Sequence, residues 1–151
     1  MNGDPLIIQQ TEKQKAEALK TAQRCLAELD RVQLDPPDYE ILKTRLSNHK
    51  VQLEYRAPMM LAYLRYRRIL KTQDVEEKKR LAIEIRKDVE QVRAVANRKY
   101  PLMKEIDYRG RKWRVGAPDF VNSKGKPAMD WNVVRTWADK MESLLAQNGV
   151  R

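Results

Sequence analysis

The sequence is poor in the residues that build disulfides, metal sites and nucleophilic active sites. It has a single cysteine, Cys25, and a single histidine, His49. A lone cysteine excludes a disulfide within the chain, so the fold does not require an oxidising compartment. One histidine and one cysteine are too few ligands for a zinc site of the usual His/Cys kind. Their structural interpretation is a helix-surface histidine and a small buried cysteine.

Long apolar runs are also missing. No segment approaches the roughly 20 apolar residues that cross a bilayer. The N-terminal stretch MNGDPLIIQQ has no basic region and no long apolar core, so we expect no signal peptide, and a cytoplasmic protein if the chain is complete. No GxxxxGK[ST] phosphate loop is present. Nothing places two carboxylates across a cleft for hydrolysis. We therefore predict no enzymatic activity and no cofactor.

What the chain does have is the composition of an amphipathic helical domain. Its 151 residues correspond to about one domain, which we place at residues 1–151. Apolar residues make up 42% and charged residues 34%, and only five glycines are present. This balance is typical of helices that each bury one apolar stripe.

Residues 11–100 predict an antiparallel three-helix bundle. Apolar residues recur at spacings of three and four, and short breaks separate the helices, which favours antiparallel neighbours. We expect Thr11 to cap the first helix and the prolines of 35–38 to end it. Pro58 predicts a kink or a split in the second helix. Residues 72–74 separate it from the third helix, which stops before residue 101.

The pattern changes over residues 101–128. Apolar and polar residues alternate around Arg109 and Gly110, which predicts a β-hairpin with Ile106 opposite Trp113. Two strands alone are marginal in water, so the hairpin must lie on the bundle, with Trp113 as its expected anchor. Residues 122–127 read as a loop. Over residues 129–148 we predict a C-terminal helix that packs on the rest, capped by Asp130.

The stretch MLAYLRYRRILK, residues 60–71, has two interpretations. Its tyrosines and arginines alternate, as on a nucleic-acid-binding surface. On a helix, however, Tyr63 and Tyr66 share one narrow face, and Leu61 and Leu64 lie nearly opposite. A helix that is apolar on two sides is packed between two neighbours, with arginine stems covering apolar surface and guanidinium groups in water. We favour core tyrosines and solvated arginines.

Positive charge is the one functional signal. The net charge is +10, and residues 101–128 hold seven lysines and arginines against three acids. Cations neutralise phosphate, and exposed aromatic rings stack on bases. The candidate polyanion-binding residues are Arg109, Arg111, Lys112, Arg114, Lys124 and Lys126, and the candidate aromatic contacts are Tyr108 and Trp113.

The segments TAQRCLAELDRVQLDPPDYEILKTRL and VQLEYRAPMMLAYLRYRRIL carry a resemblance. Their alanine- and leucine-rich helices, a proline break and an arginine-rich helix resemble the helical C-terminal accessory regions of large bacterial glycoside hydrolases related to alpha-glucuronidases and hexosaminidases. The resemblance covers residues 11–100. It implies an accessory domain that lacks the catalytic barrel, so no active-site residue carries over.

Two functional hypotheses follow. The first is a non-enzymatic accessory or protein-interaction domain, part of or related to a larger carbohydrate-active enzyme, with a protein or an adjacent enzyme domain as partner. The alternative is a basic protein that binds nucleic acid or another polyanion through residues 101–128.

Overall fold

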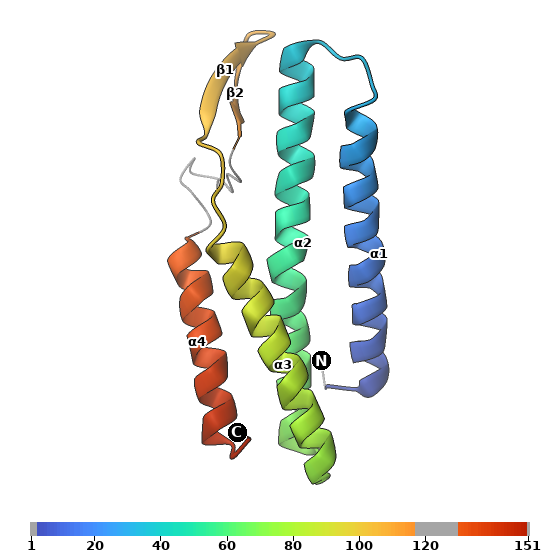
Figure 1. The fold of residues 1–151 in the computed structure, drawn as a ribbon, viewed down its shortest axis with the longest axis vertical. Helices are drawn as coiled ribbons and strands as arrows, with labels where there is room; N and C mark the ends of the chain where they lie inside the picture. Colours follow the sequence, from blue (N-terminus) through green and yellow to red (C-terminus); the bar gives the residue numbers. More distant parts are fainter. Residues whose placement is uncertain (1–2, 117–129, 151) are drawn as a thin grey trace.

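The protein is mainly α-helical, as predicted. A computed structural model describes residues 3–116 and 130–150. Along the chain lie α1 (Pro5–Leu29), α2 (Pro36–Lys71), α3 (Val75–Ala96), β1 (Lys104–Tyr108), β2 (Arg111–Val115) and α4 (Trp131–Gln147). The two strands pair as an antiparallel hairpin at the end of the molecule where α2 begins (Figure 1). The expected helical bundle, hairpin and C-terminal helix are therefore confirmed.

Helix α2 lies between α1 and α3, and α4 packs along α3 (Figure 1). The largest core cluster joins α2, α3 and α4 through small and branched side chains. Its buried members are Ala62, Ile69, Leu81, Ala82, Ile85, Val89, Ala138, Met141, Leu145 and Val150. A smaller cluster joins Ile8 of α1 to Leu61 and Leu64 of α2. The expectation that α2 is packed on two sides is thus met.

The beginning of α1 differs from the prediction. The helix starts at Pro5, and the Asp4 carboxylate accepts a hydrogen bond of 2.8 Å from the backbone N–H of Leu6. Thr11 lies inside the helix and donates its hydroxyl to the carbonyl of Ile7. The Thr11 cap was wrong because aspartate followed by proline at the first helical position is a stronger start signal.

The prolines after α1 begin a helix rather than end one. Helix α1 ends at Leu29, and Pro36 is the first residue of α2, where its missing N–H costs nothing. Helix α2 then runs unbroken through Pro58, which is buried. The split that Pro58 predicted as one alternative does not occur, because packing on both sides holds the helix together across the lost hydrogen bond.

The other predicted helix boundaries are confirmed. Residues 72–74 separate α2 from α3, and the Asp74 carboxylate accepts from the N–H groups of Glu76 and Glu77 at 2.9 and 3.1 Å. Asp130 caps α4 by accepting from the N–H of Asn132 at 2.8 Å. These short polar side chains satisfy backbone donors that have no partner within the helix.

The hairpin has the predicted register, with Tyr108 opposite Arg111 and Ile106 opposite Trp113. Arg109 and Gly110 both have positive φ, at 51° and 69°, as a tight two-residue turn requires. The expected anchor is only partly right. Trp113 is partly buried, whereas Val115 is completely buried. The N–H of Gly116 also donates to the Thr44 hydroxyl at 3.0 Å, which ties the hairpin to α2.

Residues 60–71 follow the favoured interpretation only in part. Tyr66 is partly buried against the core, and its hydroxyl accepts from the Asn148 side chain at 2.9 Å. Tyr63 is 44% exposed, so its assignment to the core was wrong. Arg65, expected in water, is buried instead. The 100° step places Arg65 on the side of α2 that faces both α1 and α3.

We predict that Ile85→Ala lowers the free energy of unfolding by about 2–5 kcal/mol, since it leaves a cavity among three helices. Ile85 is fully buried, whereas Ile83, two residues away on the same helix, is 53% exposed. The matched variant Ile83→Ala should change stability by less than about 0.5 kcal/mol. Urea unfolding followed by circular dichroism measures both, and equal losses would contradict this packing of α3.

Candidate functional site

Four of the predicted site residues line one groove, which we call the hairpin groove. It lies between the hairpin, the start of α2 and the α1–α2 connection, and has a volume of about 460 Å³. Its lining residues are Leu34, Asp38, Ile41, Leu42, Arg45, Tyr108, Arg109, Arg111 and Trp113. The structure thus brings Tyr108, Arg109, Arg111 and Trp113 together, as the sequence analysis proposed them, but as a groove shared with α2.

The remaining predicted residues lie elsewhere. Lys112 forms an ion pair with Glu105 across the hairpin at 3.1 Å, so its charge is partly neutralised. Arg114 is exposed on β2 and does not line the groove. Lys124 and Lys126 lie outside the described residues. The basic segment therefore contributes two arginines to the groove.

Guanidinium groups cover both aromatic rings of the groove. The Arg45 guanidinium carbon lies 5.1 Å from the centre of the Trp113 ring, and that of Arg109 lies 5.0 Å from the centre of the Tyr108 ring. These are distances of cation–π contacts, which hold the arginine side chains against the rings. The rings thus hold the two guanidinium groups next to the apolar residues that line the groove.

Of the residues that the structure describes, Asp38 is the only acid that lines the hairpin groove. Its carboxylate accepts a hydrogen bond of 2.9 Å from the Tyr108 hydroxyl, and lies 3.6 Å from Arg109. The hydrogen bond to Asp38 raises the pKa of Tyr108 above its usual value. Three arginines against one engaged carboxylate leave the groove positively charged and able to bind an anionic group.

Arg45 and the apolar groove residues of α2 were missed by sequence reasoning. Arg45 is separated from Trp113 by more than sixty residues of chain, and the only local signal was a basic residue near Leu42 on an amphipathic helix. Its distance to Trp113 depends on how the hairpin docks on α2, which periodicity does not determine.

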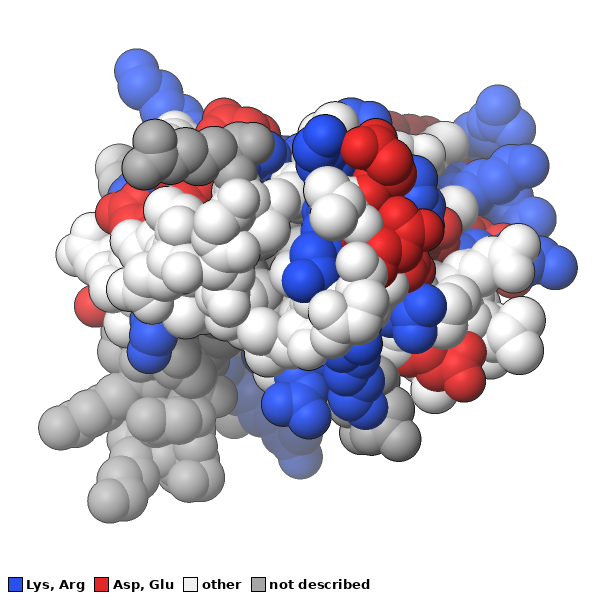
Figure 2. Space-filling model, turned by 90° about the horizontal axis from the view of Figure 1, so that it is seen from below, with Lys and Arg blue, Asp and Glu red and all other residues white. Residues whose placement is uncertain are grey.

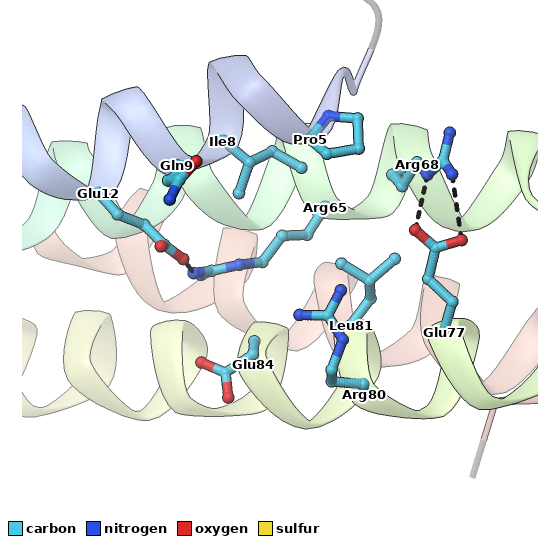
Figure 3. Close-up of a pocket in the computed structure, with 10 residues that line it drawn as sticks. All are labelled: Pro5, Ile8, Gln9, Glu12, Arg65, Arg68, Glu77, Arg80, Leu81 and Glu84. Atoms are coloured by element: carbon cyan, nitrogen blue, oxygen red, sulfur yellow. Dashed lines mark hydrogen bonds and ion pairs between the residues drawn. The ribbon is translucent and has the colours of Figure 1, made fainter.

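A second cleft lies at the opposite end, between α1, α2 and α3 (Figure 3). Its volume is about 440 Å³. The buried Arg65 side chain extends into it from α2 and pairs with Glu12 of α1 and with buried Asp88 of α3. Beside it, Arg68 and Glu77 pair through two nitrogens at 2.8 and 3.2 Å.

The basic side chains in this second cleft are matched by acidic side chains of the same cleft. Arg65 joins three helices through its two carboxylate partners, and Lys15 adds a hydrogen bond of 3.2 Å to Gln91. Burial lowers the pKa of Lys15 and raises that of Asp88 to about 6. Basic and acidic side chains are also interspersed over this end of the molecule (Figure 2). These contacts indicate a structural ion network rather than a ligand site.

Cysteine and histidine, side chains that act as nucleophiles, bases and metal ligands, each occur once within the described ranges. Cys25 is exposed on α1, contrary to the buried position expected for it, and His49 is exposed on α2 as expected. Across residues 3–116 and 130–150, no three His, Cys, Asp or Glu side chains are grouped to hold a metal ion. No helix in these ranges is long and apolar enough to cross a bilayer.

Comparison with known proteins finds no family model, no curated protein and no solved structure that matches this chain.

We predict that Asp88 makes stability depend on pH in an unusual direction. Its pKa is raised from 3.8 to about 6 in the folded protein, chiefly by burial, so the folded state binds the proton more tightly. This favours folding below the unfolded pKa, and the contribution is lost as pH rises through about 6. Between about pH 4.5 and 7.5 the loss should be about 2 kcal/mol.

Urea unfolding of the wild type and Asp88→Asn at both pH values isolates this contribution. The wild-type stability relative to that of the variant should fall as pH rises. A constant difference would show that Asp88 does not titrate in this range.

Proposed function

We propose that this chain is a non-enzymatic protein-interaction domain that binds an acidic segment of a partner in the hairpin groove. The observation that supports it is the convergence of Arg45, Arg109 and Arg111, from two distant parts of the chain, around one apolar floor. Asp38, the one carboxylate that the described part of the chain places in the groove, is already engaged by Tyr108. The groove therefore offers positive charge and apolar contact to the same ligand.

The chemistry of the groove favours carboxylate side chains next to a large apolar one. An arginine donates to a carboxylate through two parallel N–H groups, which gives both affinity and orientation. The apolar part of the floor comes from Leu34, Ile41 and Leu42, of which Leu34 and Leu42 are partly open to solvent. A segment with acidic residues flanking a leucine or an aromatic side chain satisfies both surfaces.

The resemblance to accessory regions of glycoside hydrolases suggests what kind of protein the partner is. In this proposal the acidic segment belongs to a carbohydrate-active enzyme, as an adjacent domain or a separate chain. The domain would then position that enzyme without taking part in its reaction.

Polyanion binding through the basic hairpin is the second candidate function. The positive charge of the groove favours it, because phosphate groups are bound by lysine and arginine. Base stacking is less favoured, since Arg45 and Arg109 already cover the rings of Trp113 and Tyr108. A nucleobase would have to displace these guanidinium groups, so an acidic protein segment fits the groove better.

Peptide display against the wild-type protein tests the proposal. We expect selected peptides to combine Asp or Glu with a large apolar residue. Synthetic versions should bind the double variant Arg109→Glu/Arg111→Glu at least about tenfold more weakly, because each charge-assisted hydrogen bond contributes about 1.5–3 kcal/mol. The control Lys13→Glu/Lys20→Glu changes the net charge equally at exposed positions of α1. Selected peptides without acids, or equal losses in both variants, would contradict the proposal.

A labelled single-stranded oligonucleotide tests the second candidate. If only charge attracts it, binding should weaken by orders of magnitude between about 50 and 200 mM salt. Trp113→Ala should leave such binding unchanged. Tight binding that persists at the higher salt concentration and is lost by about 1–3 kcal/mol in a folded Trp113→Ala variant would instead assign the groove to nucleic acid.

A further inference from the structure

An exposed apolar stripe continues from the hairpin groove along α2. Nine positions recur at alternating spacings of four and three, which is the heptad pattern of a helix that packs against another helix. These positions, which we call the α2 seam, are Leu42, Leu46, His49, Leu53, Arg56, Met60, Tyr63, Arg67 and Leu70. Six of the nine are apolar.

No seam position is buried in the structure. Leu42, Met60, Tyr63 and Leu70 are 42%, 47%, 44% and 49% exposed, which is unusual for large apolar side chains in a regular row. The seam lies on neither of the two covered sides of α2. Leu61 and Leu64 face α1, and Ala62 and Ile69 lie in the core with α3 and α4. A helix that is apolar on every side is normally covered on every side, so the seam lacks a partner.

Positive charge recurs along the seam: Arg56 and Arg67 are seam positions, and Arg45 lies beside it. Arg45, Arg56 and Arg67 recur every eleven residues, which is three helical turns, so they lie along one side of α2. Among the described residues, none of the three forms an ion pair with a carboxylate. The only acid on α2 after Glu40 is Glu54, and it is already paired with Lys50 at 3.3 Å and with Arg98 at 2.8 Å. The surface is thus mainly apolar, with basic side chains at intervals along it.

We propose that the α2 seam binds an amphipathic helix with acidic edges, contributed by a partner protein. This inference rests on the proposed function, because Leu42 belongs to both surfaces, Arg45 of the groove lies beside the seam, and the same partner would enter the hairpin groove at one end. The seam spans roughly 42 Å at 1.5 Å per residue, so it accepts up to about four heptads. Acidic residues spaced about eleven apart on that helix would face Arg45, Arg56 and Arg67.

A second copy of this chain fits the seam poorly. Arg56 lies at the middle of the seam, fourteen residues from each end. In a centred antiparallel pair of seams, Arg56 would face Arg56 of the other copy. In a parallel pair, Arg56 and Arg67 would each face their own copies. Like charges directly opposite one another oppose association, whereas an acidic helix neutralises them.

Synthetic helices provide the probe. One peptide of about 28 residues carries leucine at the heptad core and glutamate at the edges, a second carries lysine at the edges, and a third is the first with its order scrambled. Fluorescence anisotropy measures their binding to the full chain. We expect the glutamate-edged peptide to bind at least about tenfold more tightly than the other two, because only it matches both the apolar row and the charge.

Variants locate the binding. Met60→Glu/Tyr63→Glu changes two exposed seam residues and should weaken binding of the glutamate-edged peptide at least about tenfold, since an apolar contact is replaced by a like charge. Val75→Glu/Ile83→Glu places the same two charges at exposed apolar residues of α3 and should leave binding unchanged. Urea unfolding confirms that each variant is folded. Should the seam variant lose its fold, Tyr63→Ser replaces it.

The outcomes separate the two proposals. Suppose that Arg109→Glu/Arg111→Glu abolishes binding of the display-selected peptides, while the seam variants bind the glutamate-edged helix as tightly as the wild type does. This inference then fails, and the proposed function of the hairpin groove stands. If neither peptide class depends on its surface, both fail. Sedimentation of the protein alone tests whether two copies of the chain associate through the seam. A dimer that dissociates in the seam variant would overturn the choice of partner. Equal binding of the scrambled peptide would also overturn it.

Discussion

The packing of α2 is the constraint on which the rest of the structure depends. This 36-residue helix contacts α1 on one side, α3 on another and β2 near its beginning. The Tyr66 hydroxyl also bonds to Asn148 just after α4, so the last helix is held in place against it. Because successive side chains point 100° apart, one long helix presents separate stripes to each neighbour. Burial of Pro58 within this packing keeps the helix continuous across the missing hydrogen bond.

Arginine residues explain how so much charge coexists with a small core. Arg65 is buried where α1, α2 and α3 meet, and its two carboxylate partners offset the cost of removing it from water. Arg93 joins α3 to α4 through Glu142 and Asp139 and also pairs with Glu90 on its own helix, and these carboxylates hold its pKa above the usual value. These arginines hold helices together. The net charge therefore says little about which cations are available to a ligand.

Five of the arginines lie near one continuous surface. Arg45 stacks on Trp113 in the hairpin groove, and Arg56 and Arg67 follow along the α2 seam. The hairpin contributes Arg109 and Arg111 at one end. Apolar side chains with no internal partner lie beside these charges, so an acidic and amphipathic ligand matches the whole surface. A purely anionic ligand would match only its charge, which is why a protein partner is the better-supported proposal.

Local sequence signals were sufficient where the local chain decides the structure. Asp74 and Asp130 bond to N–H groups two or three residues away, and Arg109 and Gly110 form the turn that sets the register of the hairpin. Helical periodicity predicted that α2 is packed on two sides, because the 3.6-residue repeat places side chains on faces whatever their neighbours are. Asp4 and Pro5 carried the same kind of signal for the start of α1, but their weight over Thr11 was underestimated.

Only the tertiary structure decided which face meets which neighbour. Periodicity assigned Tyr63 to the core and Arg65 to water, yet the positions of α1 and α3 leave Tyr63 exposed and bury Arg65. The hairpin groove could be predicted as far as Tyr108, Arg109, Arg111 and Trp113, which are close in sequence. Arg45 could not, because its approach to Trp113 depends on the docking of the hairpin. The sequence by itself determines the helices, their ends and the hairpin register through short-range geometry. Burial, ion pairing and the open seam depend on distances between segments far apart in the chain, which only the packed structure sets.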